Sequence, residues 1–479
     1  MIAWFATSAA AGPALPSERY ELDNGLDVVL IRDPSVPLVA VDVWYHVGSK
    51  DEVTGRTGFA HLFEHLMFQG SPNQPDEYFA PLEKVGANLN GTTNIDRTNY
   101  YEVVPREFMP LALFLEADRM GGLVQTLTQD KLDNQREVVR NERRQRIENV
   151  PYGDARMVLY QSLYPSTHGY HHPTIGSHAD LEAATLDDVS GFFRSWYTPN
   201  DAVLVVAGDF DPAEARKWID DTFGKVPRGP EPARAPVVDP ALRASVEVRD
   251  YRAVPQRKVW IAWHSPAAAS QPDAELDLLA SILGDGRDGR LVRELVEKRQ
   301  VAREVAVFQG SAKTSSVFQI RATAADGHTT DEVVAAVDEV LAQVLAGAPP
   351  TAAELDAVRR EYRLRYLDGL EPVLGKAEVA QTCMFFSGVP DCVAEDLARF
   401  DRATPASVVA AGAAVVHTPR VVLHILPEAD RPVVAPAPAP TKRWSSDSVL
   451  RNSKKPKKPK KSKKTERPAG SAASEGGGR

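Results

Sequence analysis

Cysteine is nearly absent from this sequence, which has only two among 479 residues. They are Cys383 and Cys392, and neither stands at zinc-finger spacing from histidines. So few cysteines also exclude a small scaffold held together by many disulfides. The two can form one disulfide in an oxidising compartment or remain buried thiols, and the sequence leaves both open.

Long apolar runs are also missing, since none approaches the roughly 20 residues that a transmembrane helix needs. A chain of 479 residues is too long for one core and predicts two or more domains. Residues 1–17 are apolar and rich in small side chains but lack a positively charged start. They are interpreted as a weak or truncated export signal or as a disordered end. Export would place the protein in the periplasm or cell envelope, and the cytoplasm is the alternative.

Charge is distributed unevenly along the chain. The formal net charge is −9, while residues 441–479 carry 13 Lys+Arg and 3 Asp+Glu, so the rest of the chain is acidic. We expect residues 429–479 to be a disordered tail, first rich in Pro and Ala and then in Lys. The Lys-rich run has no aromatic side chains to stack on bases, and the body is acidic. No specific nucleic-acid partner is therefore predicted.

The strongest chemical pattern is His61-x-x-Glu64-His65, set in an apolar stretch. Histidines four apart lie on one face of a helix and can bind zinc together, and the adjacent carboxylate can take a proton from water. This order of residues is the inverzincin signature. The alternative, an apolar helix with three incidental polar residues, is disfavoured because a buried helix seldom carries such groups without a use for them.

A catalytic zinc needs a third protein ligand. Periodicity leaves five glutamates open, all on plausible elements: Glu102, Glu107, Glu116, Glu137 and Glu142. A rival cluster, His168, His171 and His172, lies in the stretch 151–176. We expect that stretch to be irregular and its histidines to be structural, because no regular element would fix their geometry.

The run 88–94 is polar on both sides, which is typical of an edge strand. Such a strand either accepts an extended peptide or is merely solvated. Farther along, Thr351-x-x-x-Leu355-Asp356 repeats Thr128-x-x-x-Leu132-Asp133, which indicates a duplication. In this alignment Arg365 takes the place of Glu142, so the second copy is predicted to bind no metal.

Three segments, 61–70, 86–93 and 136–144, together resemble the pitrilysin/insulinase family of inverzincin zinc peptidases. The nearest group is its two-domain members, which include the processing peptidases. The resemblance implies an α+β fold with two homologous domains, each a mainly antiparallel sheet packed with helices, facing each other as a clamshell. The zinc-bearing domain would span residues 18–228, the linker 229–246 and the metal-free domain 247–428.

The resemblance also implies the site. One Zn²⁺ would be held by His61, His65 and Glu142, with Glu64 as the general base. An unfolded or short peptide would bind at Asn88, Asn90, Gly91, Thr92 and Arg290. The implied function is a zinc metalloendopeptidase, and the alternative is a non-catalytic binding or assembly subunit of the same fold.

Two positions depart from the family pattern. Gln135 stands where many active members have a second glutamate near the metal. Arg303 follows Ala302 where a tyrosine would complete an Arg–Tyr substrate clamp. Because some family members are heterodimers, a homologous partner chain could supply that clamp.

Overall fold

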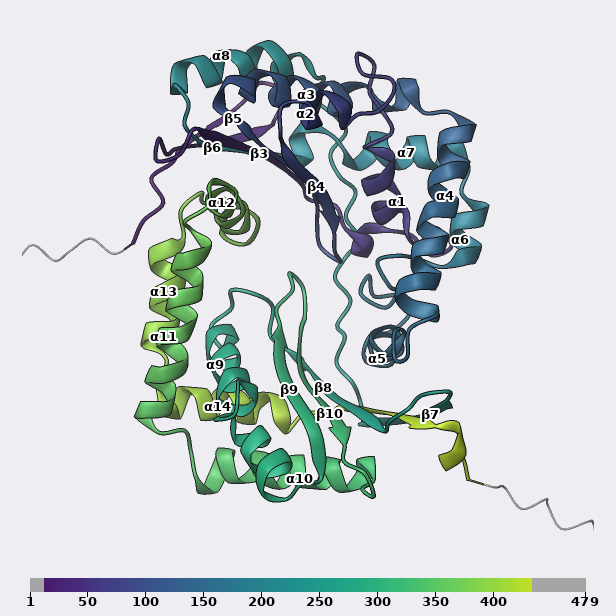
Figure 1. The fold of residues 1–479 in the computed structure, drawn as a ribbon, viewed down its shortest axis with the longest axis vertical. Helices are drawn as coiled ribbons and strands as arrows, with labels where there is room; N and C mark the ends of the chain where they lie inside the picture. The colour runs from purple at the N-terminus through teal and green to yellow at the C-terminus, as the bar shows by residue number, and fades with distance from the viewer. Residues whose placement is uncertain (1–12, 433–479) are drawn as a thin grey trace, which may run out of the picture. The chain divides into compact units, whose positions relative to one another are not determined.

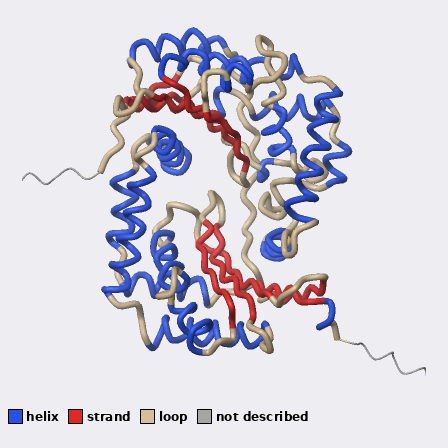
Figure 2. The backbone as a smooth tube through the Cα atoms, viewed as in Figure 1, coloured by secondary structure: helices blue, strands red, loops and turns tan. Residues whose placement is uncertain are grey.

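The computed structural model describes residues 13–432. The first 12 residues of the predicted export signal, and nearly all of the predicted tail, lie outside this range. The described part holds two β-sheets, each packed with helices (Figures 1 and 2). The predicted α+β fold is confirmed.

The first sheet has six strands in the order β1-β2-β6-β3-β5-β4. Only the β2–β6 pair is parallel, so the sheet is mainly antiparallel as expected. Its central strand β6 is wholly buried, which explains its unbroken apolar sequence. The strands are β1 (Glu18–Glu21), β2 (Asp27–Arg32), β3 (Leu38–Tyr45), β4 (Asn88–Thr93), β5 (Thr98–Pro105) and β6 (Ala202–Gly208).

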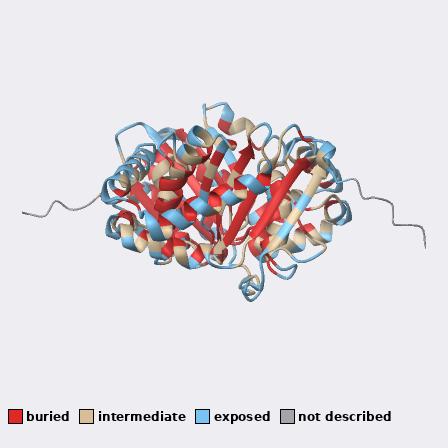
Figure 3. Cartoon of the chain, turned by 90° about the horizontal axis from the view of Figure 1, so that it is seen from below, coloured by how far each residue is buried: buried red, intermediate tan, exposed pale blue. Residues whose placement is uncertain are grey.

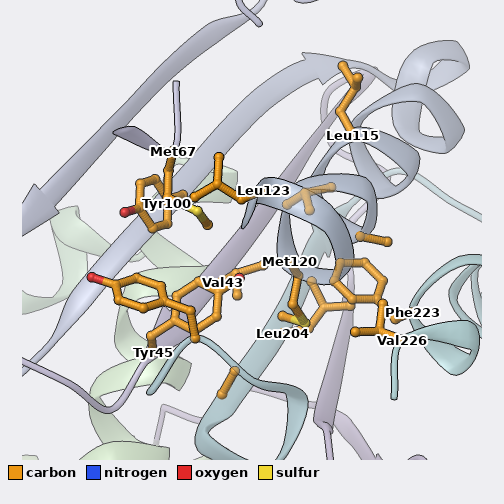
Figure 4. Close-up of a cluster of buried hydrophobic side chains, with 14 of the residues drawn as sticks. Val43, Tyr45, Met67, Tyr100, Leu115, Met120, Leu123, Leu204, Phe223 and Val226 are labelled. Atoms are coloured by element: carbon orange, nitrogen blue, oxygen red, sulfur yellow. The ribbon is translucent and has the colours of Figure 1, made fainter. Parts of the chain in front are cut away.

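Helices α1, α3 and α7 share one large core with one face of this sheet. Val43 and Tyr45 from β3 meet Met120 and Leu123 from α3 there, as Figure 4 shows. The helices of this half are α1 (Phe59–Leu66), α2 (Ala80–Glu83), α3 (Met109–Thr126), α4 (Gln129–Arg143), α5 (Ala155–Leu163), α6 (His178–Ala183), α7 (Leu186–Trp196) and α8 (Pro212–Thr222).

The second sheet has five strands in the order β7-β11-β8-β10-β9. Its only parallel pair is β7–β11, so its connectivity matches β2-β6-β3-β5-β4 of the first sheet. This shared topology agrees with a duplication, and it makes β9 the counterpart of β4. The strands are β7 (Val246–Arg252), β8 (Lys258–Ser265), β9 (Ala302–Gly310), β10 (Ser316–Ala324) and β11 (Val421–Pro427). Most strand segments are buried (Figure 3).

The helices of the second half form a second core with this sheet. Two of them begin with a capping box, in which a threonine hydroxyl and a glutamate satisfy the first backbone N–H groups. They are α9 (Asp273–Gly284), α10 (Thr330–Ala342), α11 (Ala352–Gly369), α12 (Val373–Ser387), α13 (Val393–Arg402) and α14 (Pro405–Val416). A π-helical segment, Val292–Lys298, precedes β9.

The two halves exchange helices. Helix α12 of the second half lies on the face of the first sheet opposite α3 (Figure 1), where Ala377 and Ala380 pack on Val203 and Val205. Gln381 in the same helix donates hydrogen bonds of 2.9 Å to two strand carbonyls, those of β3 and β6. The first sheet is therefore buried on both faces only in the presence of the second half.

Conversely, helix α5 of the first half covers part of the second sheet. Its Leu159 and Leu163 pack on Trp260 and Leu423 of that sheet. The prediction that 151–176 is entirely irregular was therefore wrong, because α5 forms within it. The helix has only nine residues, and its apolar side is completed by strands far along the chain. Local periodicity alone could not reveal it.

Cys383 and Cys392 form a disulfide that joins the end of α12 to the start of α13. Of the two states that the sequence leaves open, the structure has the oxidised one.

Between residues 13 and 432, no single helix is both long and apolar enough to cross a membrane. Two consecutive segments, Thr330–Gly347 and Ala352–Gly369, meet the criteria only when taken together, and they are bent by 111° from each other.

Candidate metal centre

Helix α1 carries the HxxEH motif, and its start is fixed by a loop rather than by a side chain at its first position. Gly58 has φ +90°, and a Cβ there would lie 2.8 Å from the carbonyl oxygen of Ile175. The Glu52 carboxylate accepts hydrogen bonds of 2.8 Å from the N–H groups of Gly58 and Ala60. Glu52 thereby satisfies free donors of the first turn. No motif in the sequence pointed to this role.

The two histidines lie one turn apart on one face of α1, with ring centroids 4.9 Å apart. Leu62, Phe63 and Leu66 on the other faces are fully buried, so they hold the helix in the core. Burial lowers the pKa of His61 to about 4, so its imidazole is neutral at pH 7. A neutral imidazole is the form that binds a metal.

Glu142, near the end of α4, faces both histidines. Its Oε2 lies 3.7 Å from His61 Nε2 and 3.3 Å from His65 Nε2. The hydrogen bond with His65 lowers the pKa of the Glu142 carboxyl. Zinc–ligand bonds of about 2.0 Å in a tetrahedron separate neighbouring ligand atoms by about 3.3 Å. The two nitrogens and one oxygen therefore have the atom types of a zinc site, and all three lie within 4.8 Å of one another.

The other glutamates that the sequence leaves open are engaged elsewhere. Glu102 and Glu116 are buried against Arg119, which donates to both. Glu107 pairs with Arg106 and Glu137 with Arg140, both at the surface. Of the five, only Glu142 belongs to a group whose ligand atoms converge with those of histidines.

Glu64 lies beside the metal-ligand group and under strand β4. A Cβ built on Gly91 of β4 would be 3.1 Å from Glu64 Cγ and equally close to rings of Phe68 and Tyr100. A larger residue at this position would force the strand or these side chains to shift. Burial raises the pKa of the Glu64 carboxyl, which makes its carboxylate a better proton acceptor near neutral pH.

Strand β4 is an edge of the first sheet, as predicted. The N–H of Asn94 donates to the carbonyl of Arg97 at 3.0 Å, and such bonds recur at every second residue of an antiparallel pair. The alternation turns the backbone groups of Gly91 and Thr93 toward the open edge. In agreement, the Gly91 N–H donates to the side-chain Oδ1 of Asn90 at 2.9 Å. A peptide that paired with β4 would take the Gly91 N–H and displace the Asn90 side chain from it.

Comparisons with known proteins identify the family of this chain. The zinc protease PqqE of Helicobacter pylori is 30% identical over 368 residues, which cover 74% of this chain and 80% of that protein. The family description "Insulinase (Peptidase family M16)" matches residues 27–164, and "Peptidase M16 inactive domain" matches residues 183–362. The chain belongs to the insulinase family of peptidases, family M16. An uncharacterized zinc protease of Streptomyces coelicolor is 26% identical over 367 residues, 71% of this chain and 79% of that protein.

Solved structures share the fold of this chain. The crystal structure of a protease from Helicobacter pylori superposes with a TM-score of 0.80 at 25% identity, covering 86% of this chain and all of that chain. A peptidase M16 inactive domain from Pseudomonas fluorescens gives a TM-score of 0.77 at 20% identity, covering 86% of this chain and 98% of that chain. The resemblance to the insulinase family is thus confirmed.

The structure places the remaining predicted residues as follows. Asn88, Asn90, Gly91 and Thr92 all lie on β4. Gln135 is buried on α4, and its amide donates to Asn134 Oδ1 at 2.8 Å. These positions are compatible with the predicted roles, which stay predictions.

Arg290 and Arg303 are held by local partners. Arg290 pairs with Glu354 at 2.7 Å and donates to the backbone carbonyls before α11. Arg303 pairs with the exposed Asp326. In this insulinase-family chain, a substrate would have to displace Glu354 before it could use Arg290.

The three histidines of the rival cluster do not form a metal-ligand group within the described residues. His168 Nδ1 accepts from the N–H of Tyr170 at 3.0 Å, and His171 Nδ1 donates to the carbonyl of Tyr164 at 2.8 Å. Their ligand atoms do not converge with those of His172 within the described residues. Glu247, Asp331 and His424 do converge in the second half, but Arg249 already bridges the two carboxylates.

Replacing Gly91 with valine should lower kcat/KM for peptide hydrolysis by at least about tenfold, since misplacements of about 1 Å near a reacting group have such effects. The new side chain would push β4 away from Glu64, while the metal ligands on α1 and α4 stay in place. Peptide hydrolysis assays with zinc analysis test this. Gly191→Val is the control, because no atom lies within 4 Å of its Cβ position. Equal rates for both variants would contradict the close-approach argument.

Proposed function

We propose that this chain is a zinc metalloendopeptidase that hydrolyses unfolded or short peptides. The observation that carries the proposal is the convergence of His61 Nε2, His65 Nε2 and Glu142 Oε2, with Glu64 beside them. One Zn²⁺ per chain, bound by these atoms, would supply Lewis acidity toward the scissile carbonyl and the attacking water.

The residues of the chain would do the rest. An extended peptide pairs with the open edge of β4 through the backbone groups of Gly91 and Thr93. That pairing lays the peptide backbone along the strand nearest Glu64. Glu64 accepts the proton of the attacking water and passes it to the leaving amine. Gln135 can orient neighbouring groups only through hydrogen bonds, because an amide does not titrate.

A partner chain is the second part of the proposal. Arg290 is engaged with Glu354, and Arg303 stands where the family pattern has tyrosine. Both observations favour a homologous partner that supplies the Arg–Tyr clamp. The Cys383–Cys392 disulfide favours an oxidising compartment, namely the periplasm or cell envelope.

Zinc analysis of the purified full-length chain is expected to give one zinc per chain. Removing the metal with a chelator should abolish peptide hydrolysis, and adding zinc back should restore it. His65→Ala should lose zinc, whereas His178→Ala, at a partly buried histidine paired with Glu148, should keep it. A wild-type chain without zinc would overturn the metal site.

The purified full-length chain also tests whether a partner chain is needed for hydrolysis. If the chain, shown to be monomeric by sedimentation, cleaves peptides at a rate that a homologous partner does not increase, the partner proposal is wrong. The zinc site would then still stand, because its evidence is metal content.

A further inference from the structure

The second half has a cavity at the place that corresponds to the metal centre. It has a volume of about 430 Å³ and is lined by residues of α9, β9, α11 and α13. In the first half the metal centre lies among α1, α4 and the edge strand β4. Since Thr128 and Thr351 begin α4 and α11, Arg365 in the cavity wall corresponds to Glu142. Asp277 and Ser281 are four apart on α9, as His61 and His65 are on α1.

Four aromatic side chains line this cavity, beside Arg365 and several aliphatic residues. Phe308 comes from β9, Tyr362 and Tyr366 from α11, and Phe400 from α13. The rings of Tyr362 and Phe400 are stacked with centroids 3.5 Å apart, and Tyr366 lies 5.9 Å from Tyr362. Phe308 is 45% exposed, and the Arg321 guanidinium lies 5.6 Å from the centre of its ring. Faces of such rings attract organic cations.

A carboxyl group without a partner lies in this aromatic wall. Asp277 makes no hydrogen bond or ion pair with any residue between 13 and 432, and its side chain is partly buried in the cavity wall. The two acidic residues close to Asp277 both have hydrogen-bond or ion-pair partners. Asp273 accepts from the N–H of Ala269 at 2.9 Å and from Ser311 at 2.6 Å, and Asp396 is paired with Arg399. Because this carboxyl lines the cavity and no group among the described residues is paired with it, it is a candidate for contact with a bound group.

We propose that this cavity binds an organic cation, an alkylammonium or guanidinium group, between the aromatic rings and the Asp277 carboxylate. The metal-free copy of the site would thus have kept its position at a sheet edge and changed its ligand from a metal to an organic cation. The side chains of lysine and arginine are organic cations of this kind. They could come from an added peptide, or as lysines from segment 454–464 of the chain itself. The proposal does not depend on the proposed peptidase activity.

The charges around Asp277 agree with this ligand. Burial, followed by the nearby Asp273, raises the pKa of the Asp277 carboxyl to about 8, against the opposing effects of Arg399 and Arg365. Asp396 raises it further. A bound cation favours the ionised carboxyl, so affinity should increase from pH 7 to pH 9. A lysine side chain is still protonated in that range, because its pKa is about 10.4.

The test is the binding of a fluorescent peptide with a single lysine, compared with the same peptide carrying norleucine. Anisotropy is measured at low salt with the full-length Glu64→Gln variant, so that the peptide is not consumed. The lysine peptide should bind at least about tenfold more tightly, as expected for a hydrogen bond to a charged group. Asp277→Asn should remove this difference, whereas Asp326→Asn, an exposed acid outside the cavity, should preserve it.

Carbodiimide coupling identifies the source of the cation. An amide between Asp277 and the added peptide would indicate an external ligand, and one with residues 454–464 would indicate the chain's own tail. The proposal is overturned if Asp277→Asn binds the lysine peptide as tightly as the parent, or if Asp277 couples to neither lysine. A failed peptidase assay would not affect these readouts.

Discussion

Glu64→Gln should lower kcat for peptide hydrolysis by about a hundredfold to ten-thousandfold, the usual contribution of a general base. Glutamine has nearly the same size and shape, so it should fit the space beside Gly91 and Phe68. It cannot accept the proton of the attacking water. The converging ligand atoms belong to His61, His65 and Glu142, so the zinc content should stay at one per chain.

Single-turnover hydrolysis together with metal analysis checks this expectation. Glu137→Gln is the matched control, because Glu137 is an exposed glutamate on α4 paired with Arg140, and it should hydrolyse like the wild type. Retained hydrolysis in Glu64→Gln would remove Glu64 from the mechanism. A zinc-loaded wild type that hydrolyses no peptide, with or without a partner chain, would instead favour the non-catalytic subunit.

Arg119→Met should destabilise the first half by about 3–5 kcal/mol, the typical cost of removing one member of a buried charged group. The Arg119 guanidinium is fully buried and lies 4.5 Å from the ring centre of Tyr78 and 4.4 Å from that of Tyr100. It pairs with Glu116 and donates to Glu102, whose pKa burial raises well above its ordinary value. Without the guanidinium, both carboxyl groups would lose their partner.

Urea unfolding measures this loss as a lower midpoint. Arg106→Met is the control, since Arg106 pairs with Glu107 and Asp209 at the surface and such pairs contribute about 0–1 kcal/mol. A triple variant with Arg119→Met, Glu102→Leu and Glu116→Leu should recover much of the stability, because no buried charge is left unpaired. If Arg119→Met and Arg106→Met unfold alike, the buried network contributes nothing measurable.

This network also explains what the sequence could and could not predict about the site. The HxxEH spacing predicted two ligands and a base because four residues make about one helical turn. Sequence periodicity could not choose the third predicted ligand, because Glu102, Glu116 and Glu142 all lie on regular helices or strands. Only tertiary contacts distinguish them, as Arg119 engages the first two while Glu142 faces the histidines.

The sequence predicted most of the strands of the fold but missed elements that depend on distant contacts. Alternating and apolar runs gave most strands, and the edge position of β4 followed from its polar sequence. Helix α5 was missed because its apolar side faces β8 and β11, which come far later in the chain. The disulfide was undecided because a separation of nine residues does not reveal how two side chains are directed.

The exchange of α5 and α12 has a consequence for the ancestry of the chain. If the duplicated units were once separate polypeptides, each would have exposed an apolar sheet face until it received a helix from its neighbour. Such units would persist only as an obligate dimer, and their fusion through the linker would convert that dimer into one chain. One member of the pair could then lose its metal ligands without cost to folding, because its helix would still be required to cover the other's sheet.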